Sequence, residues 1–230
     1  MYQILTVTDI KKHPIYAPLW KFMKKAHNAQ KRKTNMIARE IPYAVHPLKV
    51  LELIVNAGGG QIDNVPIVAA ALLHDIIEDT VFDTPAKLIK NITPVLGKEA
   101  SVQVAETVLQ LTNPKGLKSL EKVIWQVQHA REMDTPAKII KIADQIANIL
   151  DTVSDVNAWN LNKKKAYINK AEKVIAACYK NIKKADKQQK KMLAGLKKMA
   201  RKSLKYARFK LAFCKTLPVF TYDKIGLENL

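Results

Sequence analysis

The most informative stretch of the sequence is Ala70-Ala71-Leu72-Leu73-His74-Asp75-Ile76-Ile77-Glu78-Asp79-Thr80, in which an apolar run is followed at once by histidine and acidic side chains. The apolar run, 65–73, has no polar face, which predicts a central buried helix. Ionised carboxylates beside such a helix are costly unless they pair or bind a cation. His74 and Asp75 precede Glu78 by four and three residues, so these side chains can converge at the helix end. Imidazole and carboxylate ligands suit Mn²⁺, Fe²⁺ or Zn²⁺, and the stretch therefore predicts a metal site.

Further ligands for such an ion have to come from other parts of the chain. His46 lies at the start of an expected helix, just before Pro47. Asp144 interrupts an otherwise apolar helical face, and Asn148 follows it one turn later. From the residues alone, two roles are possible for Asp144: a metal ligand, or a carboxylate that pairs with another side chain at a helix surface. The three remaining histidines have no evident partner in the sequence pattern, and we expect structural or solvent-facing roles for His13, His27 and His129.

Helical periodicity dominates the chain, and clear period-two strands are absent. Only the short segments 2–7 and 219–222 have the composition of extended chain. Prolines and glycines delimit many of the helices, because proline favours the first turn and glycine the end. The pattern predicts a mostly α-helical bundle with helices over 19–26, 47–58, 67–77, 85–92, 99–109, 117–131, 136–153, 162–183 and 187–214.

The charge of the chain is unevenly distributed. The 230 residues carry a net charge of +19, of which the first 150 residues account for +5 and the last 80 for +14. The length fits one domain with an appendage, and we expect a catalytic domain over 1–183 and a basic amphipathic helical extension over 184–230. The extension can bind a nucleic acid, an anionic membrane or an acidic protein surface. Alternatively, its apolar stripe packs on the domain or on a second copy in an oligomer, and its lysines face water.

Cysteine content and hydropathy indicate the compartment. Two cysteines, Cys178 and Cys214, are too few for a disulfide framework. No apolar run is long enough to span a membrane, and residues 1–19 have lysines where a secretory signal would have its apolar core. These features predict a cytoplasmic protein without a membrane span.

Several motifs in order along the chain make it resemble a known family. They are 30–33, Pro42-Tyr43-x-x-His46-Pro47, the stretch 70–80 quoted above, Leu111-Thr112-Asn113 and Lys141-x-Ala143-Asp144-x-x-x-Asn148. This set resembles the hydrolase domain of RelA/SpoT-type alarmone enzymes, within the HD phosphohydrolase superfamily. It is most similar to the stand-alone small alarmone hydrolases, which include the metazoan SpoT homologue. The resemblance covers about 17–175 and implies an all-α HD-domain helical bundle, followed by the basic extension.

The resemblance also implies a site and a reaction. The implied reaction removes pyrophosphate from the 3′ position of (p)ppGpp and leaves GDP or GTP. Glu78 and Asp79 match the acidic pair that positions and deprotonates the attacking water. The ligands of one Mn²⁺ are matched by His46, His74, Asp75 and Asp144, and substrate contacts by Arg32, Lys33, Asn148, Lys163 and Tyr167.

Two other functions fit parts of the sequence. The metal-binding residues fit another HD phosphohydrolase equally well, one that acts on the 2′-phosphate of NADPH or on another nucleotide. A non-enzymatic polyanion-binding module would use the basic extension alone. The intact set of histidines and carboxylates argues against that module, because such groups destabilise the fold when they are buried without a bound cation.

Overall fold

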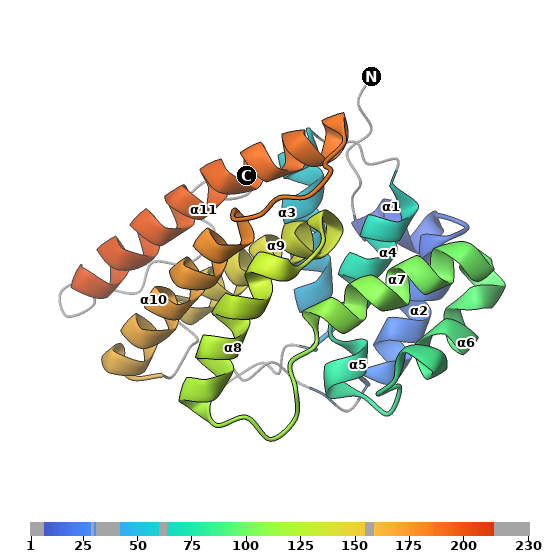
Figure 1. Ribbon diagram of the computed structural model, residues 1–230, viewed down its shortest axis with the longest axis horizontal. Coiled ribbons are helices and arrows are strands. Elements are labelled where there is room, and N and C mark those ends of the chain that lie inside the picture. Colours follow the sequence, from blue (N-terminus) through green and yellow to red (C-terminus); the bar gives the residue numbers. More distant parts are fainter. Residues whose placement is uncertain (1–6, 29, 31–41, 60–63, 155–158, 214–230) are drawn as a thin grey trace.

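The structure is a computed structural model that describes residues 7–28, 30, 42–59, 64–154 and 159–213. These residues form eleven α-helices and no β-strand, which confirms the predicted all-α class (Figure 1). No helix among them is both long and apolar enough to cross a bilayer. The helices are α1 (Val7–Lys12), α2 (Tyr16–Ala26), α3 (Val45–Gly58), α4 (Val65–Leu73), α5 (Ile76–Asp79), α6 (Pro85–Leu96), α7 (Lys98–Leu111), α8 (Ser119–Glu132), α9 (Thr135–Thr152), α10 (Leu161–Cys178) and α11 (Lys187–Phe213).

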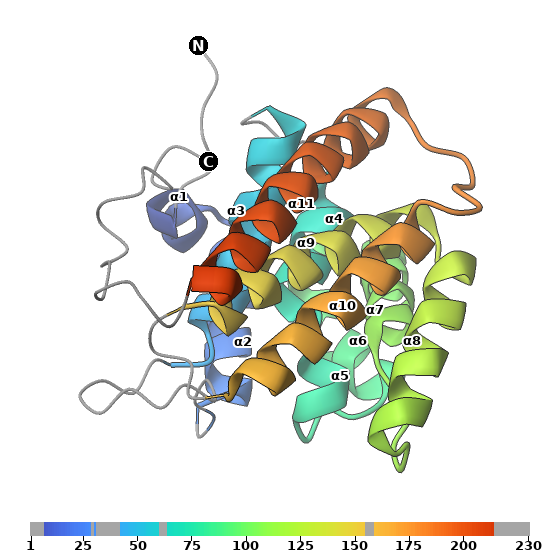
Figure 2. The ribbon, with the colours of Figure 1, turned by 90° about the vertical axis from the view of Figure 1, so that its left-hand side faces the viewer.

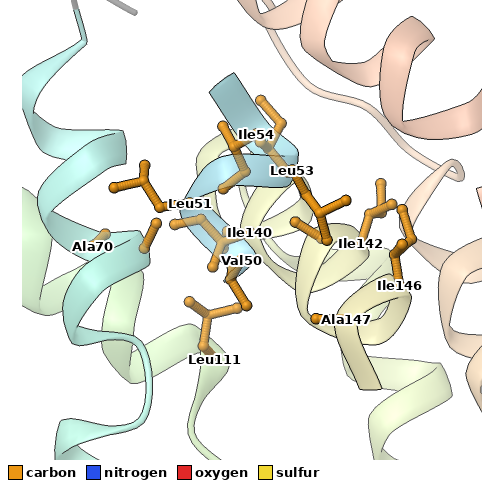
Figure 3. Packing of buried hydrophobic residues seen from close by; sticks show 14 of the residues in the cluster. Val50, Leu51, Leu53, Ile54, Ala70, Leu111, Ile140, Ile142, Ile146 and Ala147 are labelled. Atoms are coloured by element: carbon orange, nitrogen blue, oxygen red, sulfur yellow. The ribbon is translucent and has the colours of Figure 1, made fainter. Parts of the chain in front are cut away.

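The core lies where α3, α4 and α9 meet. Every residue of α4 from Ile67 to Leu73 is buried, as its continuous apolar run predicts. Figure 3 shows Val50 and Ile54 of α3 beside Ile140 of α9, with Ala70 of α4 on the other side. The helices α2 and α7 cover α4, while α10 and α11 cover α9. Because α3, α4 and α9 are fixed by this apolar contact, the polar side chains at their ends are held in fixed positions as well.

The long basic helix α11 lies across the outside of α3 and α9 (Figure 2). Gly195 makes a close approach possible, since a Cβ atom there would lie 2.6 Å from the carbonyl oxygen of Ala57 on α3. The apolar stripe of α11 is therefore buried on the domain, which is one of the two arrangements expected for it. Its buried residues are Met192, Leu193, Leu196, Ala200, Leu204, Ala207 and Leu211. The division of the chain at residue 183 stays a prediction.

Two of the predicted helix ends were wrong because side chains donate hydrogen bonds to backbone carbonyls at these positions. The helix predicted over 67–77 ends at Leu73, where the Nδ1 atom of His74 donates to the carbonyl of Ala71 at 2.9 Å. In a continuing helix that carbonyl would accept from the backbone N–H of Asp75. The helix predicted to reach 183 ends at Cys178, and the carbonyls of the following turn accept hydrogen bonds from Lys138.

A third helix end was wrong because proline is tolerated there. The chain continues as α6 through Pro94 to Leu96, although the helix was predicted to end before Thr93. Pro94 lies in the last turn on the exposed side, where water can satisfy the carbonyl that its missing N–H leaves open. Of the two candidate extended segments, Val7 begins α1 instead, and 2–6 and 219–222 lie outside the described residues.

Candidate metal centre and active-site cavity

Two histidines and a carboxylate converge at one end of α3 and α4. The ligand atoms of His46, His74 and Asp75 all lie within 4.8 Å of one another. Asp144 of α9 joins them, with its Oδ1 atom 3.1 Å from Nε2 of His46. The two histidine rings meet edge to face with centroids 5.2 Å apart. The structure thus brings together the four side chains for which the sequence predicts a metal-binding role.

The orientation of His74 suits a bound cation. Its Nδ1 atom donates to the carbonyl of Ala71, so Nε2 is the atom that faces the carboxylates. Nε2 lies 2.9 Å from Oδ2 of Asp75, yet it is buried without a well-formed hydrogen bond among the described residues. Burial is the largest single influence and lowers the pKa of His74, but the contact with Asp75, the charge of Asp144 and the hydrogen bond to Ala71 together outweigh it and raise the pKa to about 9. The site therefore favours positive charge at Nε2, which a proton or a metal ion can supply.

Neighbouring side chains hold the two carboxylates in their ionised form. Burial alone would raise the pKa of Asp75, but the His74 and His46 rings and a hydrogen bond from Tyr43 hold it well below its usual range. Asp144 accepts hydrogen bonds from Asn148 at 2.5 Å and from Gln145 at 2.9 Å. Burial also opposes its ionisation, yet the contact with His46 and the charge of Lys141 keep the pKa of Asp144 well below its usual range. Ionised, oriented carboxylates and an imidazole with a fixed Nδ1–H are typical of metal ligands.

Glu78 is held at the edge of this cluster by a separate set of hydrogen bonds. Its Oε2 atom accepts from the backbone N–H of Asn113 at 3.0 Å and from the Asn113 side chain at 2.7 Å. Its Oε1 atom accepts from Lys122 at 3.1 Å. Gln126 donates in turn to Oδ1 of Asn113 at 2.7 Å and fixes that side chain. Glu78 is thereby positioned without belonging to the histidine–carboxylate cluster.

Asp79 follows Glu78 at the end of α5 and is more exposed than Glu78. Burial, together with the charges of Asp75 and Glu78, raises the pKa of Asp79 to about 6. The backbone carbonyl of Asp79 accepts from the side chain of Gln30, which also bonds His27 at 2.7 Å. These contacts tie α5 to the end of α2.

A cavity of about 830 Å³ opens in front of these residues. Asn148 and Tyr167, two of the predicted substrate contacts, line it. Lys163 does not line it; its Nζ atom lies 4.4 Å from the centre of the Trp159 ring. The other two predicted contacts, Arg32 and Lys33, lie outside the described residues. The cavity therefore brings two of the five predicted substrate residues to the metal centre.

Several residues that line the cavity were not predicted from the sequence. Tyr43 and Asn113 belong to motifs that were recognised, but their side chains had no assigned role. His27 is buried as a structural histidine is expected to be, and its ring stacks on Tyr43 at 4.5 Å. The cavity wall also contains Trp159, Lys122 and Lys170, which have no local signal in the sequence, and Lys141, which belongs to the motif of Asp144 but had no assigned role.

Comparisons with known proteins agree with this arrangement. The sequence model of the HD-domain family matches residues 43–149, which include all the predicted metal ligands and both predicted catalytic acids. The guanosine-3′,5′-bis(diphosphate) 3′-pyrophosphohydrolase MESH1 of Danio rerio is 30% identical over 135 residues, which are 58% of this chain and 69% of that protein. This chain belongs to the MESH1 family of HD-domain proteins. The predicted resemblance is thereby confirmed at the level of the family.

Other members of the MESH1 family are similarly related. The Homo sapiens protein is 29% identical over 67% of this chain and 79% of its own length, and the Drosophila melanogaster protein is 29% identical over 65% and 76%. A solved structure reported as a metazoan ortholog of SpoT that hydrolyzes ppGpp matches with a TM-score of 0.62. It covers 81% of this chain and 93% of its own at 24% identity, which supports the shared HD-domain fold.

Proposed function

We propose that this chain is a guanosine-3′,5′-bis(diphosphate) 3′-pyrophosphohydrolase. Water adds to the phosphorus that is bonded to the 3′ oxygen, the bond between that phosphorus and the 3′ oxygen breaks, and the oxygen gains a proton. The products are pyrophosphate and GDP, or GTP when the 5′ group is a triphosphate. The observation that carries the proposal is the convergence of His46, His74, Asp75 and Asp144 beside an open cavity in a member of the MESH1 family.

The residues of the cluster fit a divalent cation, and we infer that it is Mn²⁺. The buried Nε2 of His74 faces a carboxylate, and the mixed set of imidazole and carboxylate donors suits this ion. His46, His74, Asp75 and Asp144 would hold it. When bound, a divalent ion lowers the pKa of a water molecule and polarises a phosphoryl oxygen. The side chains around the cluster, Tyr43 and Asn148 among them, keep the ligands ionised and oriented.

Glu78 is assigned the role of the group that accepts the proton of the attacking water. Its two oxygens are fixed by Asn113 and Lys122, so the carboxylate is pre-oriented next to the cluster. Asp79 supports it, and its pKa, raised to about 6, suits a group that is ionised at neutral pH and can exchange a proton slightly below it. Asn148 and Tyr167 would contact the nucleoside, and we keep Arg32, Lys33 and Lys163 as proposed contacts to the base and phosphates.

The competing activities can be separated in one experiment. The purified protein is assayed with ppGpp, NADPH and GTP side by side, with Mn²⁺ and after chelation. We expect Mn²⁺-dependent release of pyrophosphate from ppGpp and much slower turnover of the other two substrates. Faster turnover of NADPH or GTP would replace the proposed substrate, and inactivity towards all three would leave the polyanion-binding module.

The basic face of α11 supports a weaker, second candidate function. The helix contains ten lysines and arginines and no acidic residue, and its apolar stripe is already buried. Binding of a nucleic acid or another polyanion would use this exposed face and depend steeply on salt. Oligomer formation and a cytoplasmic location likewise stay predictions.

A further inference from the structure

Lys170 differs from the other two lysines of the cavity wall. Lys122 of α8 pairs with Glu78, and Lys141 of α9 lies 3.8 Å from Oδ2 of Asp144. Lys170 of α10 forms no ion pair with a carboxylate among the described residues. Its Nζ atom lies instead 4.3 Å from the centre of the Tyr167 ring. Lys170 is therefore a partly buried ammonium group that faces the cavity without an anion of its own.

The surroundings of Lys170 disfavour the charged form of its side chain. Burial and the neighbouring charge of Lys141 lower the pKa of Lys170 to about 8, and Lys122 acts in the same direction. Lysines from three helices thus line the same cavity, and among the described residues Lys122 and Lys141 have a carboxylate partner whereas Lys170 has none. An aromatic ring offsets part of the cost of a desolvated ammonium, but an oxyanion offsets much more. The charges of Asp144 and Glu78 offset only part of this effect, so a bound anion would stabilise the charged form of Lys170 further.

The position of the three lysines indicates which part of a substrate reaches them. Lys141 contacts Asp144 and Lys122 contacts Glu78, so the wall adjoins both the metal cluster and the proposed base. A phosphate directly joined to the reacting phosphate lies within reach of such a wall. Phosphates on the far side of a ribose ring are separated from the reacting phosphate by that ring.

We propose that Lys170, together with Lys122 and Lys141, binds the distal phosphate of the diphosphate that is cleaved. This oxyanion subsite rests on the proposed function and names the feature of the substrate that it selects. It favours a ribose that carries a diphosphate at the reacting position over one that carries a single phosphate. A phosphate monoester fills the metal end of the cavity and leaves Lys170 unpartnered.

Binding of inorganic pyrophosphate tests the subsite without turnover. Calorimetry with the Mn²⁺-loaded protein compares pyrophosphate with orthophosphate for the wild type and for Lys170→Met. Loss of a charge-assisted contact predicts pyrophosphate binding weaker by about 10- to 100-fold, with orthophosphate binding changed by less than about threefold. Lys170→Arg should restore most of the pyrophosphate affinity. Lys173→Met is the matched control, since Lys173 is exposed one turn further along α10.

Kinetics with two substrates tests the selectivity. The ratio of kcat/KM for guanosine 5′-diphosphate 3′-diphosphate over guanosine 5′-diphosphate 3′-monophosphate should fall by about tenfold or more in Lys170→Met. Equal losses for both substrates, or for both inorganic anions, would overturn the assignment to the distal phosphate. Unchanged binding would overturn it too. Without ligand, the variant should unfold at a temperature no lower than the wild type, because it removes a desolvated charge.

The outcome for the subsite is independent of the outcome for the proposed function. If the wild type hydrolyses ppGpp and Lys170→Met behaves like it, the subsite is wrong and the function stands. If the wild type does not hydrolyse ppGpp but Lys170→Met loses pyrophosphate binding, the subsite stands and the substrate has to be sought among other diphosphate esters.

Discussion

His46 and Asp144 are separated by 98 positions in the sequence, yet Nε2 of the first lies 3.1 Å from Oδ1 of the second. The contact exists because α3 and α9 pack through apolar side chains on one side and present polar ones at the cavity. Asn148 and Gln145 then orient the carboxylate from within α9. Assembly of the site therefore depends on the docking of α3 on α9.

Removal of Asp144 should abolish metal binding. We expect Asp144→Ala to weaken Mn²⁺ binding by at least about 100-fold, because a ligand and the anchor of His46 are lost together. Calorimetry of Mn²⁺ binding and the rate of pyrophosphate release measure the effect. Asp83→Ala, which removes an exposed carboxylate paired with Lys87, serves as the control and should leave both unchanged. Full Mn²⁺-dependent activity in Asp144→Ala would contradict the assignment of the ligands.

Glu78 should be required for turnover and dispensable for Mn²⁺ binding. Glu78→Gln keeps the size of the side chain but cannot accept the proton of water, so we expect kcat to fall by about 10²- to 10⁴-fold. Mn²⁺ affinity, measured by calorimetry, should stay within about threefold of the wild type. A comparable loss of Mn²⁺ binding would instead make Glu78 a ligand.

Asn113 should act through Glu78 as a positioning residue. Asn113→Ala removes one of the two hydrogen bonds to Oε2 of Glu78, and we expect kcat to fall about tenfold with KM little changed. In the Glu78→Gln background the same substitution should have almost no further effect, because the oriented group is already lost. Additive losses in the double variant would show that Asn113 acts elsewhere.

The sequence made the local part of this site predictable and left the tertiary part open. His74, Asp75 and Glu78 lie within five residues, so helical spacing alone brought them together. The three cavity lysines come from three helices, and their convergence depends on how α8, α9 and α10 pack. A lysine that faces a cavity and one that faces water have the same local pattern, so nothing local marks Lys170 as a residue of the cavity wall.

The helix ends show the same limit of prediction. The apolar run to Leu73 predicted the central helix correctly. It did not predict that the side chain of His74 would bind the Ala71 carbonyl and end the helix there. Likewise, the end of α10 depends on Lys138, which lies 40 residues before Cys178 in the chain. Local propensity cannot report such long-range competition for backbone groups.

Lys138 should be a major stabilising residue although it lies far from the cluster. It is fully buried, and its Nζ atom donates to the carbonyls of Arg131, Lys180 and Asn181 at 2.7–2.9 Å. Lys138→Met keeps the aliphatic chain but leaves three carbonyls without this donor. We expect the free energy of unfolding to fall by about 2–4 kcal/mol, partly offset by the removal of a buried charge.

Urea denaturation measures the effect of Lys138→Met. Lys183→Met is the control, because Lys183 is exposed and only distantly paired with Asp134, at 3.9 Å. It should change the free energy of unfolding by less than about 0.5 kcal/mol. Equal stability of Lys138→Met and the control would mean that water replaces the ammonium at all three carbonyls.

Gly195 tests whether α11 is docked on the domain in solution. In an exposed helix, replacement of glycine by alanine stabilises by about 1 kcal/mol. In the docked arrangement the new Cβ atom would lie 2.6 Å from the Ala57 carbonyl oxygen and 2.7 Å from its Cα atom, so α3 and α11 have to separate. We therefore expect Gly195→Ala to destabilise the protein by about 1–3 kcal/mol, opposite in sign to the helix propensity.

The neighbouring position provides the matched comparison. Ala194 is exposed, so Ala194→Gly should follow propensity alone and destabilise by about 1 kcal/mol. Urea denaturation of both variants gives the sign of the change in the free energy of unfolding for each substitution. Stabilisation by Gly195→Ala would mean that α11 does not rest on α3, and residues 184–230 would then be a separable extension. Destabilisation would mean that α11 rests on the domain, so a chain ending at residue 183 would expose the apolar surface that Met192 and Leu196 cover. A comparison of that shortened chain with the full chain would then not measure the effect of the basic face alone.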